Sequence, residues 1–166
     1  MTKMDRNTEP KWDADIRETI ARAVHEDYRR ARANKSQSQE PPMAEWDELL
    51  DYLKESNRQQ ADHIFKKIHR IGCTIHKVTK RNVTPITFTK DEVEIMAEME
   101  HARWNIERLR NGWQWGEKRD SIKKTSPYLV SWSQLPDKVK EWDRHTVRSI
   151  PELLARVGLE VRRDEA

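Results

Sequence analysis

Apolar and polar positions along most of this chain repeat with the period of a helix rather than that of a strand. Ala21, His25, Tyr28 and Arg32 are spaced by four, three and four residues, which places them on one helical face. The same spacing recurs 76 residues later in the chain, on residues of similar type. The pattern predicts helical stretches at about 13–33, 46–71 and 89–111, and a fourth that ends before residue 158.

Two glycines predict where helices stop. Gly72 and Gly158 follow the second and fourth helical stretches, and glycine readily takes the left-handed conformation that ends a helix. A short extended piece follows each glycine, at residues 73–76 and 159–161. These two pieces are expected to pair as small strands.

Other local signals predict where helices begin or bend. Thr89 with Glu92 three residues later has the spacing of a capping box. Ser133 is expected to cap the fourth helical stretch, and Pro151 either kinks that stretch or starts a new helix. A split of the second stretch is expected near residues 56–57.

The chain contains an internal repeat. Sliding it by 86 residues places residues 46–72 on 132–158 without a gap, and nine of the 27 positions are identical. The upstream helical face aligns at a shift of 76, so the second copy has ten extra residues, which lie within 112–127. Two blocks in the same order indicate a duplication.

The sequence therefore predicts a mainly α fold of two tandem helical repeats that pack as one pseudo-twofold unit, with a short β-hairpin in the second repeat. The expected parts are a first repeat at 13–76, a linker at 77–88 and a second repeat at 89–162. The residues expected in the core are Trp46, Trp132, Leu49, Leu135, Ile64, Ile150, Leu154, Tyr28 and Trp104.

Composition narrows the class of protein. Hydrophobic residues make up 35% of the 166 residues and charged residues 37%, so the core must be thin, although seven Trp supply large apolar surfaces. The net charge of +3 comes from 32 basic and 29 acidic residues that are interleaved, which argues against a dedicated nucleic-acid protein. Cys73 is the single cysteine, which excludes an internal disulfide and suits the cytoplasm. No apolar run reaches membrane-spanning length, and no signal peptide is expected.

The second copy carries a distinctive series of motifs, which run Gly-Trp-Gln-Trp-Gly at 112–116, Arg-Asp at 119–120, Lys-Thr-Ser-Pro-Tyr-Leu-Val at 124–130 and Leu-Pro at 135–136. This series resembles the RyR domain, a repeat found in pairs in ryanodine receptors and also in bacterial proteins. Ser121 and Ser126 depart from the residues usual in that family. The first copy lacks both the Gly-Trp motif and the Arg-Asp pair, so it resembles a degenerate repeat.

The resemblance implies a non-enzymatic module whose paired repeats form a cleft for nucleotide-like or drug-like ligands. The residues themselves suggest how such a ligand would be held. Trp113, in a loop with glycines at both ends, is expected to stack on a base, which contributes about 1–3 kcal/mol. Arg119 and Lys124 are expected to bind phosphate. Asp143 with Asn57, at equivalent positions of the two copies, is expected to contact polar edges of the ligand, and each is followed by an arginine, Arg144 in the second copy.

Structural roles for the same residues remain open from the sequence. Trp113 and Trp115 can hold a short hairpin onto the helices, and Arg119 can pair with Asp120 or Asp143. Lys124 can be solvated. Asn57 and Asp143 can cap helices that restart there.

The chain carries none of the common sequence signatures of hydrolases, zinc proteases, P-loop proteins or dinucleotide-binding enzymes. His25 and His101 are expected to be hydrogen-bonded at helix interfaces rather than bound to metal. We therefore expect no catalytic residue, metal or cofactor. The leading hypothesis is a sensor for a nucleotide or related anionic aromatic metabolite; the alternatives are docking of a partner peptide in the same cleft and, third, nucleic-acid binding.

Overall fold

The computed structural model describes residues 14–33, 43–80, 82 and 84–164. The fold is mainly helical. Its α-helices are α1 (Ala14–Arg32), α2 (Asp51–Arg70), α3 (Lys90–Arg110), α4 (Asp137–Arg148) and α5 (Ile150–Arg156). Single 3-10 turns, η2 (Trp46–Glu48) and η3 (Trp132–Gln134), precede α2 and α4. None of the described helices combines the length and apolarity needed to cross a bilayer.

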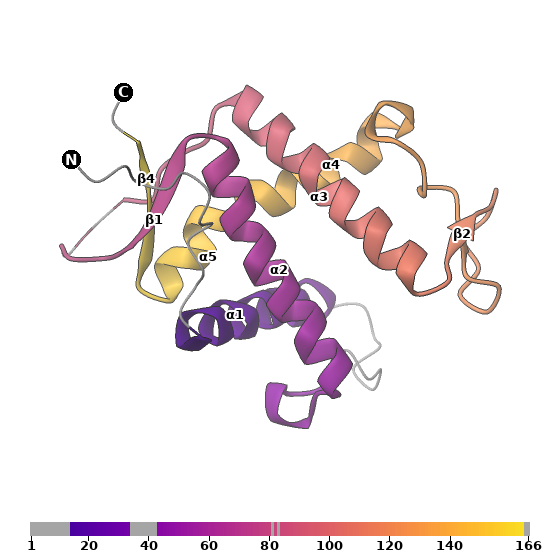
Figure 1. Ribbon diagram of the computed structural model, residues 1–166, viewed down its shortest axis with the longest axis horizontal. Coiled ribbons are helices and arrows are strands. Elements are labelled where there is room, and N and C mark those ends of the chain that lie inside the picture. The colour runs from indigo at the N-terminus through magenta and orange to yellow at the C-terminus, as the bar shows by residue number, and fades with distance from the viewer. Residues whose placement is uncertain (1–13, 34–42, 81, 83, 165–166) are drawn as a thin grey trace, which may run out of the picture.

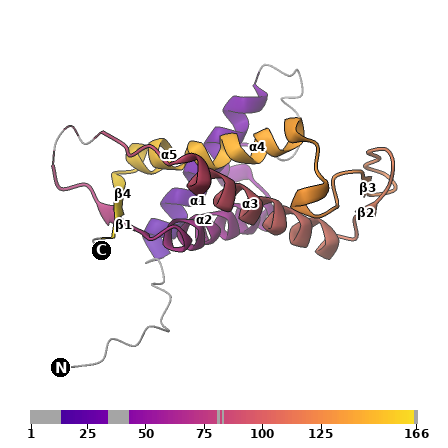
Figure 2. The ribbon, with the colours of Figure 1, turned by 90° about the horizontal axis from the view of Figure 1, so that it is seen from above.

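The helices pack in pairs, α1 against α2 and α3 against α4, and α5 also contacts α1. Two small sheets lie at opposite ends of the molecule (Figures 1 and 2). One end holds β1 (Cys73–Lys77) and β4 (Leu159–Arg163), which pair antiparallel as predicted. The other end holds β2 (Gln114–Trp115) and β3 (Thr125–Ser126).

One hydrophobic core unites both halves of the chain. Its fully buried members include Ile20 of α1, Ile68 of α2, Met96 of α3 and Leu154 of α5. Six of the nine residues predicted for the core are buried, and the other three are half-buried. Those three are Tyr28, Trp104 and Trp132.

The predicted helix ends are confirmed where the signal is local. The Thr89 hydroxyl accepts the Glu92 N–H at 3.2 Å, and the Glu92 carboxylate accepts the Thr89 N–H at 2.7 Å. Gly72 and Gly158 have φ of +74° and +77°. Pro151 lies in the first turn of α5, so it starts a new helix.

Two predicted boundaries are wrong. The second helical stretch does not split at residues 56–57; the break comes earlier, because η2 ends before Leu49 and Leu50, which are extended, and α2 then runs unbroken. Ser133 does not cap α4. Ser131 bonds the Gln134 side chain at the start of η3 instead.

The predicted hairpin of the second repeat is corrected to a parallel pair. β2 runs parallel to β3, with Gln114 opposite Thr125 and Trp115 opposite Ser126. The segment between them first folds into a tight turn, closed by an antiparallel bridge between Asp120 and Thr125. Asp120 runs antiparallel to Thr125, so the chain has already reversed once between β2 and Asp120. The turn reverses it a second time, and β3 therefore runs in the same direction as β2.

Candidate functional site

A row of aromatic and basic side chains runs along one face of α3. His101, Trp104 and Arg108 lie three and four residues apart, so they share that face. The His101 and Trp104 rings stack with centroids 5.9 Å apart. The Arg108 guanidinium lies 5.4 Å from the centre of the Trp104 ring.

The chain turns back after α3 and adds a second indole to this row. Gly112 has φ of +82°, and the Trp113 N–H donates to the Arg108 carbonyl at 3.0 Å. This left-handed stop places the half-buried Trp113 ring 4.8 Å from the Arg108 guanidinium. Arg108 therefore contacts two indoles, Trp104 and Trp113, which we call the indole–arginine face.

Arg108 is electrostatically unusual. Among the described residues it makes no ion pair, whereas its neighbour Arg103 pairs with Glu100 and Glu107. Burial lowers the pKa of Arg108; the charge of Glu107 raises it, and the positive charge of Arg119 lowers it further. A partly desolvated cation without a carboxylate partner, near a second cation, attracts an anion.

The first half of the chain also reaches this face. The phenol of Tyr28, on α1, raises the pKa of Arg108, so the two groups lie near one another. Arg32 covers the Tyr28 ring at 4.7 Å, as Arg108 covers Trp104 at the equivalent position. The face is therefore asymmetric, because Trp113 is present only in the second half.

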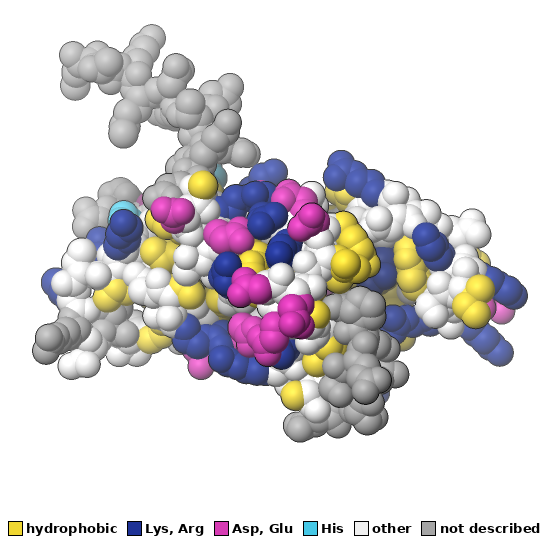
Figure 3. Space-filling view, turned by 90° about the horizontal axis from the view of Figure 1, so that it is seen from below, with side chains coloured by type: hydrophobic (Ala, Val, Ile, Leu, Met, Phe, Trp, Pro, Cys, Tyr) yellow, Lys and Arg dark blue, Asp and Glu magenta, His cyan; other side chains and the backbone are white. Residues whose placement is uncertain are grey.

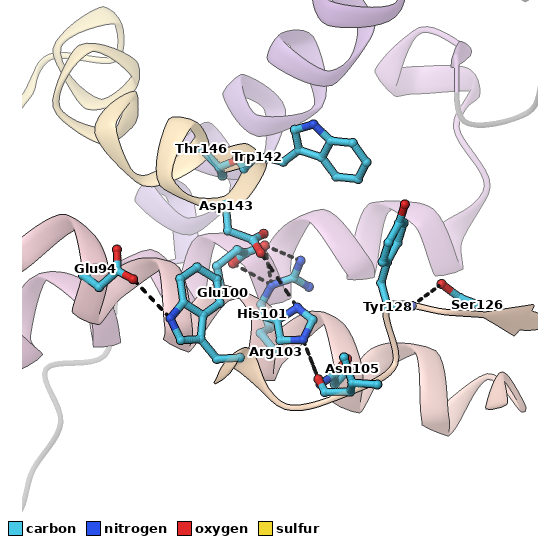
Figure 4. A network of polar contacts seen from close by, with 12 residues as sticks. Glu94, Glu100, His101, Arg103, Asn105, Ser126, Tyr128, Trp142, Asp143 and Thr146 are labelled. Carbon is cyan, nitrogen blue, oxygen red and sulfur yellow. Dashed lines mark hydrogen bonds and ion pairs between the residues drawn. The ribbon is translucent and has the colours of Figure 1, made fainter. Parts of the chain in front are cut away.

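An unusual carboxylate lies at the other end of the row, at Asp143 of α4 (Figure 4). Its Oδ2 is 3.8 Å from Nδ1 of His101, and its side chain is 21% exposed. Burial raises the pKa of Asp143 to about 7, and Glu100 adds to the rise, while Lys67 and Arg103 oppose it. Raised carboxyl pKa values are common at binding sites.

Two aromatic rings stand beside Asp143. The Trp142 and Tyr128 rings meet edge to face with centroids 5.8 Å apart, and Trp142 is 56% exposed. Figure 4 shows the Trp142 ring extending from α4 toward the Tyr128 ring, while the Asp143 carboxylate is directed to His101. They offer further stacking surface next to a hydrogen-bond acceptor.

A network of buried ion pairs lies next to the His101–Asp143 end of the row. Lys67 of α2 donates to Glu100 at 2.6 Å, and Arg103 donates to Glu100 at 2.7 Å. Burial raises the pKa of Glu100, but the two cations outweigh it and hold the value at about 2. His63 lies close by, and burial lowers its pKa to about 4. The network ties α2 to α3 across the two halves.

The structure brings together only some of the predicted site residues. Trp113 contacts Arg108 directly, and Arg119 is near enough to affect the Arg108 pKa. Lys124 lies on the same loop with φ of +54°, and its Nζ donates to the Asn111 carbonyl at 2.9 Å.

The other predicted residues have structural partners. Asn57 is buried and donates to the Leu53 carbonyl within α2, at 2.9 Å; it does not cap a helix, because α2 is continuous there. Arg144 pairs with Glu94 at 2.8 Å and lies over the Trp132 ring. Neither side chain joins the indole–arginine face through a hydrogen bond or ring contact.

Arg108 is the residue of the indole–arginine face that the sequence argument did not single out. In the sequence it is only the residue that lies 76 positions after Arg32. The available signal was the spacing of Trp104, Arg108 and Trp113, which places an arginine between two indoles only if the chain reverses at Gly112.

The histidines have the structural role predicted for them. The Nε2 atom of His25 is 2.8 Å from the Ala44 carbonyl, and that of His101 is 2.7 Å from the Val130 carbonyl. Within the described ranges, no group of three His, Cys, Asp or Glu side chains has the arrangement of a metal site.

The second half of the chain matches the model of a known protein family. The model of the RyR domain matches residues 81–163, which include α3, the loop with both indoles, α4 and α5. A search of curated proteins finds no match.

Proposed function

Because the chain belongs to the RyR domain family, we propose that it is a non-enzymatic module that binds a nucleotide or related anionic aromatic metabolite. The ligand lies on the indole–arginine face. The observation that carries the proposal is the Arg108 guanidinium, which is half-buried against two indoles and has no ion-pair partner in the described part of the chain.

Each end of the row suits a different part of such a ligand. An arginine can donate two parallel hydrogen bonds to a phosphate, so Arg108 and Arg119 bind the anion, with Lys124 at the edge. Trp113 stacks on the base. Asp143 lies beside His101, which precedes Arg108 by seven residues on α3. Its carboxylate accepts hydrogen bonds from a polar edge of the ligand. Arg144 bonds α4 to α3 through Glu94, Asn57 bonds within α2, and neither touches the ligand.

The test uses a matched pair of arginines. A panel of nucleotides is screened by thermal shift, and a ligand at 100 times its Kd should stabilise the protein by about 2.7 kcal/mol. We expect Arg108→Ala to weaken binding more than tenfold. Arg32→Ala removes the equivalent arginine of α1, which among the described residues lies over Tyr28 and over no indole, and should change affinity little.

Two outcomes would redirect the proposal. If no nucleotide shifts melting while a peptide partner binds in an Arg108-dependent manner, the face docks a protein. If affinity for single-stranded nucleic acid falls steeply with salt, nucleic-acid binding is the function. If Arg32→Ala and Arg108→Ala weaken nucleotide binding equally, the indole–arginine face is not the site.

We also propose that the two halves arose by duplication and pack as a pseudo-twofold unit, the first half being degenerate. Matched contacts at the shifts of 76 and 86 residues support this. They are His25–Ala44 and His101–Val130, Arg58–Glu18 and Arg144–Glu94, and Arg58 over Trp46 and Arg144 over Trp132. The same hydrogen bonds and ring contacts have been kept while the loop sequences diverged.

We propose that the protein is cytoplasmic, and the environment of its cysteine supports this. Cys73 is a free thiol and 1% exposed, and burial raises its pKa. A chain whose single cysteine is a buried, unreactive thiol suits a reducing compartment. Secretion into the medium of the native host would contradict this placement.

A further inference from the structure

We propose that the loop of residues 112–126 is also a docking surface for an anionic lipid membrane, which it meets through the exposed side chains of Ile122 and Trp115 and the lysines around them. This inference goes beyond the ligand site, because it uses the outer side of the loop. Trp113 and Arg119 serve the ligand site. Ile122 and Trp115 make no contact with Arg108 that would place them there.

The outer side of the loop exposes large apolar groups. Ile122 is 93% exposed and Trp115 is 56% exposed. A single exposed apolar residue is ordinary. An almost fully exposed isoleucine at the tip of a loop that also presents an exposed tryptophan is not explained by packing within the fold.

The tip is held in a defined shape. One carboxylate oxygen of Asp120 accepts the N–H groups of Ile122 and Lys123, at 2.9 and 3.0 Å. The backbones of Asp120 and Thr125 exchange two hydrogen bonds, at 3.0 and 2.9 Å. These bonds close the turn at its base and leave Ile122 projecting from it. Because the turn is already held in one conformation, it loses little conformational entropy when it binds.

Positive charge concentrates at the same end of the molecule. Residues 110–126 contain five basic and two acidic residues, so this segment carries a net charge of +3, equal to that of the whole chain. Asp120 is one of the two acids, and its carboxylate is directed to the backbone of the turn. Figure 3 shows the contrast: acidic and basic side chains alternate over the middle, while basic and apolar side chains dominate the end that carries the loop.

The combination favours a membrane over a nucleic acid. Basic residues attract both polyanions, but an aliphatic tip gains free energy only in an apolar medium. Tryptophan is favoured at the membrane–water interface, and juxtaposed lysines are attracted to the anionic cytoplasmic leaflet. The loop has the elements of a shallow anchor, which would hold the ligand site of a cytoplasmic protein close to the membrane.

Flotation of the full chain with phosphatidylcholine vesicles, with and without phosphatidylserine, tests the proposal. We expect binding only to the anionic vesicles. Ile122→Ser should weaken it about tenfold and Lys123→Ser about fivefold. Tyr52→Ser is the matched control, because Tyr52 is 67% exposed on α2 and outside the loop; it should change nothing.

A second readout separates insertion from electrostatic attraction. Ile122→Cys allows a polarity-sensitive dye to be attached selectively, since Cys73 is buried. We expect a blue shift of the dye on anionic vesicles. Absence of vesicle binding, or binding that Ile122→Ser leaves unchanged, would overturn the proposal, as would a loop that binds single-stranded DNA more tightly than vesicles. Arg108→Ala should leave vesicle binding intact, so failure here is distinguishable from failure of the ligand site.

Discussion

His101 Nδ1 and Asp143 Oδ2 lie 3.8 Å apart, beyond the reach of a hydrogen bond, so the Asp143 carboxylate is partly buried without a donor among the described residues. Its neighbour Glu100 is also negative. Such a carboxylate destabilises the fold when it is ionised. A partly buried carboxylate without a donor, at the end of the indole–arginine face, is consistent with the binding role proposed for Asp143.

The first prediction concerns Asp143→Asn, which introduces the amide that Asn57 provides at the equivalent position. The folded pKa of Asp143, about 7, is above its unfolded value. The favourable contribution of protonation is therefore complete below pH 4 and is lost as the pH rises through 7. The variant should match the wild type near pH 4 and exceed it by about 2 kcal/mol at pH 8. Urea denaturation at each pH measures this.

A stabilising effect at pH 8 should be accompanied by weaker ligand binding, since the acceptor is lost. If Asp143→Asn instead destabilises the protein at pH 8, then the wild-type carboxylate accepts a hydrogen bond in solution, and His101 is the nearest candidate for its donor. His63 titrates in both proteins, so its contribution cancels in the difference.

The second prediction concerns the Lys67–Glu100 pair. Lys67→Met removes one cation from the buried Glu100 carboxylate, and we expect a loss of about 3 kcal/mol in unfolding free energy. After Lys67→Met, Glu100 keeps only Arg103 as a cationic partner among the described residues. Adding Glu100→Gln removes this under-compensated charge, so the double variant should be less destabilised than the sum of the single variants. Lys66→Met, at the exposed adjacent position, is the control and should change stability by less than about 0.5 kcal/mol. Strict additivity would contradict the role given to the pair.

The elements that could be predicted from the sequence are those that depend on nearby residues. The Thr89–Glu92 box and the stops at Gly72 and Gly158 each involve contacts within one turn of the chain. The pairing of β1 with β4 was also predicted, because each strand follows a stop at an equivalent place in the repeat.

The elements that could not be predicted depend on contacts between distant residues, which the pattern of hydrophobic and polar positions does not indicate. The parallel pairing of β2 and β3 requires the chain to reverse twice between them, once before Asp120 and once in the turn after it. The position of Arg108 between two indoles depends on the return of Trp113 after the Gly112 stop. The ion pair of Arg144 with Glu94 spans 50 residues, so a sequence motif that suggests a ligand contact can instead be a bond between helices.

The third prediction uses the matched ion pairs of the two halves. Arg58–Glu18 and Arg144–Glu94 are each 2.7–2.8 Å apart, and each arginine also lies over a tryptophan. Double-mutant cycles should give each pair a similar coupling energy, about 1 kcal/mol.

The exposed pair Arg22–Asp47, at 3.8 Å, is the control for these cycles and should show coupling near zero. A large coupling in one half only would show that the two contacts, though alike in geometry, have come to differ in their contribution to stability.

The last prediction concerns Gly116, where β2 passes close to β3. A Cβ at this position would lie 2.7 Å from Cβ of Thr125, nearer than side chains tolerate. Gly116→Ala must therefore push the two strands apart and weaken the bonds from the Gln114 N–H to the Lys124 carbonyl and from the Gly116 N–H to the Ser126 carbonyl. We expect faster hydrogen exchange at these amides, while the core, which lies among the helices, keeps its protection. Because the strands fix the loop that carries Trp113 and Arg119, ligand affinity should fall as well; unchanged affinity with a loosened loop would mean that the ligand depends on α3 alone.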